Sequence, residues 1–202
     1  MSARQLAKRI ALGLATIAVI PALVSFRLRA AFVGRDRALE GSTQALALVP
    51  GLTGQYLRRA FLSRTLVACH PSATIEFGTI FSSTGARLDE HVYVGPRCHL
   101  GLVHIERDVL IAAGVHIPSG GHIHGTVDSA VPFREQPLHR TLVTIGAGAW
   151  VGSASVVMAD VGPNTIVGAG AVVTRPLPAD VLAGGVPARV ITQRRRPDEA
   201  PS

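Results

Sequence analysis

The sequence is poor in aromatic residues and in cysteine. Aromatic residues make up only 4% of the 202 residues, which disfavours a sandwich fold built around large aromatic side chains. The two cysteines, Cys69 and Cys98, are too few for a disulfide framework, and neither stands in a CxxC or Cys/His metal-binding spacing. The composition therefore excludes a small disulfide-stapled domain and favours a reducing compartment.

Acidic residues are also scarce, because 13 of them face 20 lysines and arginines, for a net charge of +7. Such a charge can indicate nucleic acid, an anionic membrane or a polyanionic ligand, so the positions of the basic residues decide. They gather near the two ends, in the first 37 residues and in the run Arg194–Arg196. Aromatic residues are not interleaved with them as base stacking requires, so we expect no nucleic-acid partner.

An uncharged, apolar stretch near the N-terminus runs from Ile10 to Phe26. As a helix it would span roughly 25 Å, slightly less than a bilayer core of about 30 Å. Arg27 follows where a signal peptide would place small residues, so we expect the segment to be retained. We predict that residues 1–33 form an apolar helix, kinked at Pro21, which associates with a membrane; a helix packed on the main domain is the alternative.

The sequence pattern of residues 34–72 predicts a connector that contains an amphipathic helix over Gln55–Val67. The apolar and basic positions of this helix are Tyr56, Leu57, Phe61 and Leu62 against Arg58, Arg59 and Arg64. The helix either caps the open end of a repeat domain or lies on an anionic membrane surface. We favour the cap, and one helix can do both.

From about residue 73 onward, aliphatic residues recur with a period of six. The repeat starts are Ile75, Phe81, Leu88, Val94, Leu100, Ile105, Ile111, Ile117 and Ile123 in a first block, and Ile145, Val151, Val157, Val161, Val167 and Val173 in a second. This period requires a short strand and a turn that recur three times in each closed coil, with the repeat start pointing inward. It predicts an all-β repeat fold, a parallel β-helix of about five coils over residues 73–191, preceded by the helical extension and followed by a basic, disordered tail over 192–202.

The second block resembles the C-terminal signature of the hexapeptide-repeat acyltransferases. It reads IGAGAWVGSASVVMADVGPNTIVGAGAVVTRPLPADVLAGGVPARVI, and the similarity is greatest to galactoside, serine and colanic-acid-type O-acetyltransferases. The stretch VYVGPRCHLG and the N-terminal extension favour the last group. The resemblance implies a left-handed β-helix, assembly as a homotrimer and acetyl-coenzyme A as co-substrate, with no metal. One departure is the step from Val157 to Val161, two residues shorter than the usual repeat, which predicts a tightened corner.

The six-residue period is lost after Ile123 for about twenty residues, and an interruption of this length in a regular fold indicates a loop with a function. In the family, a loop at this point contributes a histidine to a cleft between subunits. For the loop over residues 124–144 the resemblance implies His124 as the general base, with His122 as second choice and His139 in reserve. A neutral imidazole can deprotonate the acceptor hydroxyl, which then attacks the acetyl carbonyl directly.

The resemblance also implies a coenzyme A site on the second block. Matching the signature residue by residue, Ser153 and Ala169 would offer backbone groups to the pantetheine arm. Thr174 and Arg175 would meet the phosphates, a contact that suits a guanidinium.

Two further positions complete the predicted cofactor site. Trp150 would pack on the pantetheine arm or on the acceptor. Family members often carry a basic residue just after the final aliphatic pair, where this chain has Thr192. Arg189 or the run Arg194–Arg196 would take its place.

Two other functions suit a β-helix, because a fold does not fix an activity. In a γ-class carbonic anhydrase, three histidines from adjacent subunits hold a metal, and His116, His122 and His124 are close in sequence, but the family's histidine pair five residues apart is absent. A scaffold that polymerises at a membrane would need coils without the loop. The sequence favours a saccharide or polysaccharide precursor as acceptor and a cytoplasmic enzyme at the inner face of the plasma membrane.

Overall fold

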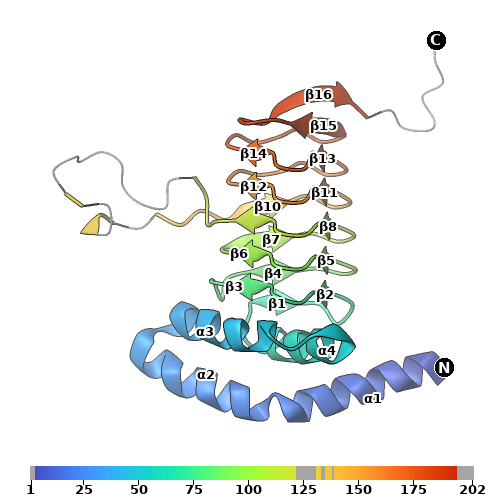
Figure 1. The fold of residues 1–202 in the computed structure, drawn as a ribbon, viewed down its shortest axis with the longest axis vertical. Coiled ribbons are helices and arrows are strands. Elements are labelled where there is room, and N and C mark those ends of the chain that lie inside the picture. The colour runs from blue at the N-terminus through green and yellow to red at the C-terminus, as the bar shows by residue number, and fades with distance from the viewer. Residues whose placement is uncertain (1–2, 122–130, 133–134, 138, 195–202) are drawn as a thin grey trace.

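A three-sided column of stacked coils stands on a base of helices (Figure 1). The computed structural model describes residues 3–121, 131–132, 135–137 and 139–194. The helices within these residues are α1 (Ala3–Ala18), α2 (Ile20–Val33), α3 (Arg35–Ala47) and α4 (Gly51–Leu62). All of them precede the first strand, so the chain is built as a helical base followed by a repeat domain.

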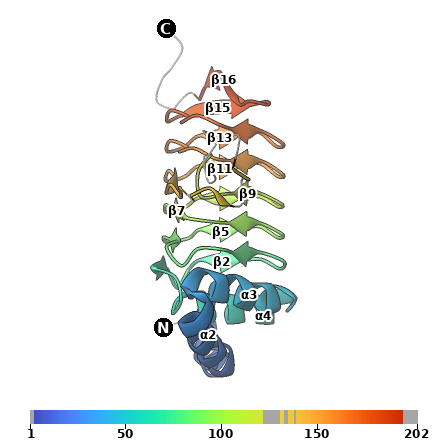
Figure 2. The same cartoon turned by 90° about the vertical axis from the view of Figure 1, so that its left-hand side faces the viewer.

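The coils contribute short strands to three sheets, here named A, B and C. Sheet A contains β1 (Ala68–Cys69), β4 (Arg87–Leu88), β7 (Val103–Ile105) and β10 (Val143–Ile145). Sheet B contains β2 (Thr74–Ile75), β5 (Tyr93–Val94), β8 (Leu110–Ile111), β11 (Trp150–Val151), β13 (Ile166–Val167), β15 (Val181–Gly184) and β16 (Arg189–Gln193). Sheet C contains β3 (Ile80–Phe81), β6 (His99–Leu100), β9 (His116–Ile117), β12 (Val156–Val157) and β14 (Val172–Val173). Strands of successive coils pair in parallel, as the stacked arrows of Figure 2 show.

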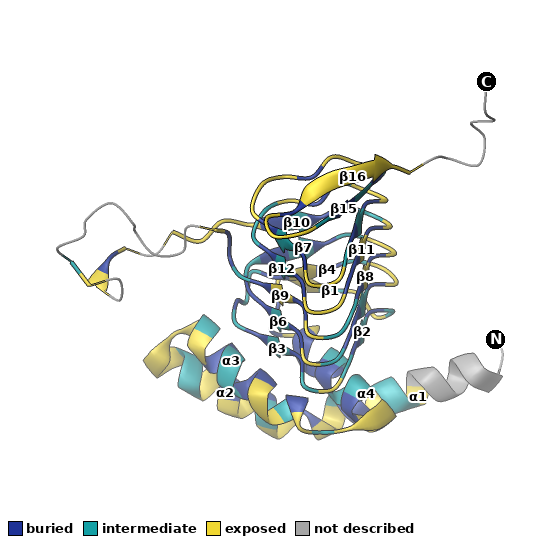
Figure 3. Ribbon diagram, turned by 45° about the horizontal axis from the view of Figure 1, so that its top comes forward, coloured by how far each residue is buried: buried dark blue, intermediate teal, exposed yellow. Residues whose placement is uncertain are grey.

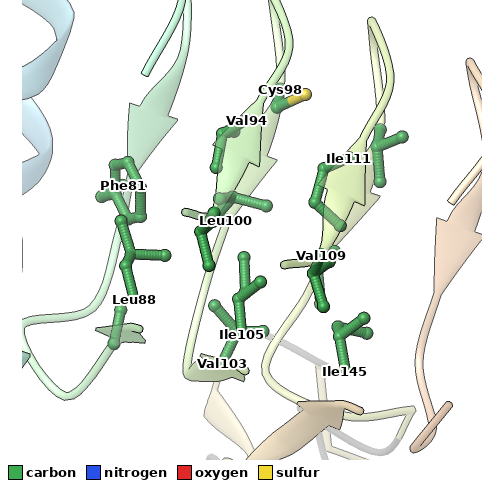
Figure 4. Packing of buried hydrophobic residues seen from close by; sticks show 14 of the residues in the cluster. Phe81, Leu88, Val94, Cys98, Leu100, Val103, Ile105, Val109, Ile111 and Ile145 are labelled. Carbon is green, nitrogen blue, oxygen red and sulfur yellow. The ribbon is translucent and has the colours of Figure 1, made fainter. Parts of the chain in front are cut away.

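The repeat starts predicted from the six-residue period are buried, inward-facing positions wherever the structure describes them, and Ile123 lies outside the described residues. In a two-residue strand such as β6, the first residue faces outward and the second is fully buried. Leu100 pairs with Ile117 one coil on, and Figure 4 shows Val94, Leu100 and Ile111 directed into the same core. Five three-sided coils are complete and β15 belongs to a sixth, so the predicted parallel β-helix of about five coils is confirmed.

Glycine at the position after a repeat start lets the coils stack closely. A Cβ on Gly152 would lie 2.5 Å from the backbone nitrogen of Ala169 in the next coil, and a Cβ on Gly146 would lie 2.5 Å from the nitrogen of Pro163. Small polar residues connect the coils at the same corners. The Ser155 hydroxyl lies 2.8 Å from the Gly152 carbonyl oxygen and 3.0 Å from the Gly168 carbonyl oxygen of the next coil. The corners therefore require these small residues.

The corner after Val157 is tight, as the shortened repeat predicts. Sheet A has no strand at this level, and Val161 alone bridges Ile145 below it and Leu177 above it. The Asp160 carboxylate accepts a hydrogen bond of 2.7 Å from the Thr144 amide. One side chain thus replaces the pairing that the two missing residues would have supplied.

Helices α3 and α4 cover the open end of the first coil. Leu39, Phe61 and Leu62 are fully buried there. The predicted helix bounds of Gln55–Val67 are wrong, because α4 follows Pro50 and ends at Leu62. The early start is possible because Gly54 packs where a Cβ would lie 2.0 Å from a carbonyl oxygen of the preceding turn.

Arg58 of α4 is the main polar element of this cap. Its side chain faces inward and is only 2% exposed, although the amphipathic pattern placed it on the outer, basic face. Its guanidinium donates to the carbonyl oxygens of Ile75 (3.0 Å), Leu46 (3.1 Å) and Val49 (2.8 Å). Arg58 therefore joins the end of α3 to the first coil, and burial lowers its pKa.

Helices α1 and α2 form a second layer beneath the cap. The chain breaks between them at Val19, and Pro21 occupies the first turn of α2, where its missing N–H costs no hydrogen bond. Their inner side packs on α3 and α4, with the ring of Phe26 edge-on to that of Phe61 at 5.9 Å. Within the described residues no single helix has the length and apolarity to cross a bilayer, although the segments Ile10–Ala18 and Ile20–Val33, bent by 44°, meet that test together.

The repeat domain extends slightly beyond its predicted limits of 73 and 191. β1 begins at Ala68, and β16 ends at Gln193 after pairing antiparallel with β15. Thr192 and Gln193, predicted as the start of the tail, are therefore part of the hairpin that ends sheet B.

Candidate active site

The two ends of the long loop meet at the corner between sheets C and A. The Ser119 carbonyl oxygen accepts the Thr141 amide at 2.9 Å, and the Ser119 hydroxyl accepts the Leu102 amide at 2.9 Å. Gly120 has φ +90°, and a Cβ there would lie 2.9 Å from that of Thr141. The chain thus leaves the column and returns at one point. His122 and His124, predicted as the base, lie outside the described residues, and His139 is exposed.

Two hollows lie on either side of this loop base. The first, of about 170 Å³, faces the N-terminal coils and is lined by His99, His116 and Arg140 among others. The second, of about 240 Å³, faces the C-terminal coils and is lined by residues that include Gly121 and Thr174. Gly121, the last described residue before the loop, and Thr174, a predicted cofactor residue, line this hollow together.

His99 and His116 form a pair on the outer face of sheet C. They are register partners in adjacent coils, with ring centroids 5.0 Å apart at 38°. Partial burial, and then the neighbouring His99, lower the pKa of His116. The Nε2 atom of His99 is buried and has no hydrogen-bond partner among the residues described. Sequence reasoning missed this pair, although each histidine directly precedes a repeat start and therefore faces outward on the same sheet.

Arg140 connects the loop to the helical base. Its guanidinium pairs with the Asp36 carboxylate near the start of α3. Asp36 also accepts hydrogen bonds of 2.8 Å from both the amide and the hydroxyl of Thr84. Burial alone would raise the pKa of Asp36, but these hydrogen bonds and the Arg140 charge outweigh it and lower the pKa. The loop is therefore held on its N-terminal side by an ionised carboxylate.

The predicted cofactor residues of the second block lie along the two edges of sheet C. Thr174 and Arg175 are exposed and follow β14 at the corner that carries the loop. Ser153 and Ala169 are exposed at the opposite corner, where the Gly170 amide donates to the Ser153 carbonyl oxygen at 2.8 Å. Between the two corners runs the outer face of β12 and β14, whose outward residues are valines.

Trp150 and Arg189 both stand on strands of sheet B, whereas these four residues border sheet C. Trp150 is 49% exposed on the outer face of sheet B, beside Leu110 of the coil below. Arg189 is exposed on β16, and its guanidinium donates to the Ala188 carbonyl oxygen at 3.0 Å. In a single copy of the chain Trp150 lies on another sheet than β14, and Arg189 directly follows Ala188, whose amide donates to the Val172 carbonyl oxygen of β14 at 2.8 Å.

No cluster of three or more histidine, cysteine or acidic side chains suited to a metal occurs in the ranges that the structure describes. His116, weighed as a carbonic anhydrase ligand, stacks on His99 within these ranges. The two loop histidines of that hypothesis are among the residues not described. The candidate site thus consists of the loop base on the β-helical column and the two hollows beside it.

This arrangement is that of a hexapeptide-repeat β-helix, and known proteins share it. No family model matches the chain. The chain is 27% identical to the galactoside O-acetyltransferase of Escherichia coli over 71% of its own length and 81% of the relative's. It is 32% identical to the putative lipopolysaccharide biosynthesis O-acetyl transferase WbbJ of Escherichia coli, over 56% of this chain and 60% of that one.

Solved structures show the same fold. A galactoside acetyltransferase in complex with coenzyme A superposes with a TM-score of 0.64 at 23% identity, over 79% of this chain and 81% of that one. A maltose O-acetyltransferase from Clostridium difficile gives a TM-score of 0.65 at 20% identity, over 80% and 89%. These structures confirm the predicted left-handed β-helix. The O-acetyltransferase relatives bear out the resemblance to hexapeptide-repeat acyltransferases and the prediction of an acyltransferase.

Proposed function

We propose that this chain transfers an acetyl group from acetyl-coenzyme A to a hydroxyl of a saccharide, with a loop histidine as general base. The observation that carries the proposal is the second hollow, which Gly121 and Thr174 line together. It joins the start of the loop to the coils that resemble the coenzyme A site of the family. The relatives named for galactoside, maltose and lipopolysaccharide O-acetylation support a saccharide acceptor.

The co-substrate lies on the C-terminal coils in this proposal. The outward valines of β12 and β14 offer an apolar strip to the pantetheine arm, and the backbone at Ser153 and Ala169 borders the strip. Thr174 and Arg175 stand at the other edge, where an exposed hydroxyl and guanidinium suit a phosphate. The thioester then lies beside the loop base.

The acceptor lies in the first hollow, on the other side of the loop. Three polar side chains, those of His99, His116 and Arg140, line this hollow, whereas the cofactor strip presents valines. Its imidazoles can exchange hydrogen bonds with sugar hydroxyls, since a neutral ring carries both a donor and an acceptor nitrogen. The lowered pKa of His116 keeps that ring neutral at physiological pH.

The reaction needs one base and no acyl-enzyme. His124, or His122, accepts the hydroxyl proton while the oxygen attacks the acetyl carbonyl carbon, and the tetrahedral adduct then collapses. The C–S bond breaks, the acetyl ester remains on the sugar, and the imidazolium returns its proton to the coenzyme A thiolate. Positioning of the two substrates supplies much of the rate.

Replacement of each loop histidine tests the assignment. We expect His124→Ala to lower kcat by about a hundredfold or more, with His122→Ala measured in parallel and the exposed His70→Ala as a control of equal chemistry outside the hollows. Transfer of labelled acetyl to a panel of sugars and lipid-linked saccharides gives the rates and the acceptor. Near-wild-type turnover in both loop variants would disprove a histidine base in this loop.

Two measurements separate this function from its rivals. Calorimetry with coenzyme A should give saturable heat, whereas a structural scaffold would give none. Metal analysis of the purified protein should give substoichiometric zinc, whereas a carbonic anhydrase would hold one metal per site.

The assembly and location remain part of the proposal. We expect a homotrimer in which neighbouring copies complete the cleft, and a cytoplasmic enzyme that acts at the inner face of the plasma membrane on a polysaccharide precursor. Light scattering should give three times the mass of the chain, and a monomer with full activity would contradict the shared cleft.

A further inference from the structure

The outer side of helices α1 and α2 carries a continuous row of exposed apolar side chains. This outer stripe consists of Ile10, Leu14, Ile17, Ile20, Val24, Leu28 and Phe32. Its members recur every three or four residues, which places them on one helical face, and Phe32 is 88% exposed. Figure 3 shows much of α2 in yellow, as exposed.

The helix pair is therefore apolar on both of its sides. Val19, Leu23 and Phe26 are buried against the base, while the stripe faces away from it. Such a surface is unfavourable in water, because a helix that is hydrophobic all round is normally enclosed on every side. The stripe therefore requires an apolar partner.

Charge and geometry identify a lipid surface as that partner. Exposed arginines border the C-terminal part of the stripe, with Arg27 next to Leu28 and with Arg35 and Arg37 just beyond Phe32. Basic residues beside an apolar helical face are typical of segments that lie on anionic membranes. The inner side is held by the cap, and the pair is bent by 44°. A segment held in this way lies in the plane of one leaflet.

A pocket of about 690 Å³ opens beside the stripe, between α1, α4 and the first two coils. Leu12 and Leu52 form its apolar part, and Leu52 is 70% exposed. Arg59 supplies its charge, with its guanidinium carbon 4.8 Å from the centre of the Tyr56 ring. The pocket thus joins an apolar rim to a cation at the level where a head group would lie.

Arg59 is only partly satisfied within the protein. One terminal nitrogen donates to the Ala73 carbonyl oxygen at 3.4 Å, while Nε is buried and lacks a hydrogen-bond partner in the described parts of the chain. His70, Ser72 and His91 also line the pocket, and its lining contains no acidic side chain. A buried, unpaired guanidinium nitrogen among hydroxyl and imidazole groups suits a phosphate oxygen.

We propose that the outer stripe lies in one leaflet of an anionic membrane and that the Arg59 pocket binds the phosphate of a phospholipid head group. This inference deepens the membrane association proposed above and is independent of the transfer chemistry. It assigns the stripe to the acyl-chain boundary and Arg59 to the phosphate level of the same leaflet.

Vesicle flotation of the purified full chain tests the stripe. Wild-type protein should float with vesicles of phosphatidylcholine and phosphatidylglycerol, and more weakly with phosphatidylcholine alone. The double variant Leu14→Glu/Ile17→Glu should lose about a hundredfold in partitioning, because each substituted residue loses the burial of a large apolar side chain. Wild-type protein that stays in solution with both vesicle types would overturn the proposal, and so would a double variant that floats normally.

Arg59→Gln tests the pocket against Arg107→Gln, which removes the same charge from an exposed position two coils higher on the column. We expect Arg59→Gln to lose about fivefold in partitioning to anionic vesicles, to bind pure phosphatidylcholine as wild type does, and Arg107→Gln to change neither. Equal effects of the two variants would reduce Arg59 to a general surface charge and overturn the pocket. If Arg59→Gln melts at a lower temperature than wild type, Arg59→Lys replaces it, because lysine keeps the charge and loses the two parallel N–H donors of the guanidinium. Arg59→Lys should then also bind anionic vesicles more weakly than wild type, and wild-type binding would overturn the pocket.

Two further measurements identify the source of the phosphate and the occupant of the stripe. Calorimetry with soluble glycerol phosphate should give no saturation below millimolar concentration, since the lipid chains supply most of the affinity; tight binding would indicate a free metabolite and contradict the lipid assignment. Light scattering of the double variant should match wild type, whereas a smaller oligomer would show that a second copy covers the stripe. Acetyl transfer to a soluble sugar should be unchanged in all these variants, which separates failure here from failure of the proposed enzyme.

Discussion

His99 and His116 influence each other because the coil repeat places them one above the other. A protonated ring would face a second imidazole at a centroid distance of 5.0 Å, inside a partly buried hollow. Both conditions disfavour charge on His116 and lower its pKa. A neutral His116 beside the loop is suited to hydrogen bonds with hydroxyl groups.

His116→Ala should therefore weaken the acceptor and spare the co-substrate. The loss of one hydrogen bond and its packing predicts a rise of about tenfold in the KM for the sugar, with the KM for acetyl-coenzyme A unchanged. Since the pKa of His116 is lowered, the wild-type acceptor KM should stay constant as the pH falls to the ordinary histidine value of about 6.5 and rise only below it. Equal changes in both KM values would contradict the division into two hollows.

The two cysteines should be unreactive in the folded protein. Burial raises the pKa of Cys69 to about 12 and also raises the pKa of Cys98, so little of the reactive thiolate exists at pH 8. We expect iodoacetamide to modify neither thiol in native buffer within an hour, and both in denaturant. Mass spectrometry reads the outcome, and fast native labelling of Cys69 would mean that the first coil opens readily.

Among the elements, the corners are where the sequence constrains the stacking most tightly. A corner glycine lies against the backbone of the next coil, so an added methyl group cannot be accommodated by rotating a side chain. A helical glycine on the outer side of α1 has no such neighbour. The same substitution should therefore have opposite signs in the two kinds of element.

Gly152→Ala and Gly13→Ala form a matched pair. The first places a Cβ 2.5 Å from the Ala169 nitrogen and should lower the free energy of unfolding by about 2 kcal/mol. The second meets nothing within 4 Å and should raise it by about 1 kcal/mol through helix propensity. Urea titration followed by circular dichroism measures both, and a stabilising Gly152→Ala would refute the close stacking of coils.

Arg58→Leu should destabilise the cap by about 3 kcal/mol. The substitution leaves three carbonyl oxygens, including those of Ile75 and Val49, without their buried donor. Arg107→Leu at an exposed corner is the control and should change stability by no more than about 0.5 kcal/mol. Thermal melts compare the two, and equal melting temperatures would show that water replaces the guanidinium.

The elements also show which features a sequence can reveal. Each inward residue of the column could be read from its period, because only one register buries all of them. The bounds of α4 could not be predicted from the sequence, since Pro50 and Gly54 are residues that usually interrupt a helix. Only the structure shows that Gly54 packs closely against the preceding turn. The burial of Arg58 has the same cause, as its partners come from α3 and β2 rather than from its own helix.

At the scale of the whole molecule, the repeat makes architecture predictable and leaves the site less so. The position of the loop follows from a lost period, but the hollows at its base depend on contacts between distant segments. The ion pair of Arg140 and Asp36 joins residues that are 104 positions apart in the sequence, so no local pattern predicts it. His99 and His116 were readable in principle, yet their proximity matters only once the coils are stacked.

The column stands upright on the α1–α2 layer, with the coils stacked away from it (Figure 1). In the proposed docking the number of coils below the loop sets the distance between the loop and the membrane, because each coil adds about 4.8 Å. The loop leaves after the third coil, so acetylation takes place at a set height above the leaflet. Acceptors on lipid-linked stems would then be selected by stem length as well as by sugar, and one inserted coil would shift the preferred stem by about 5 Å.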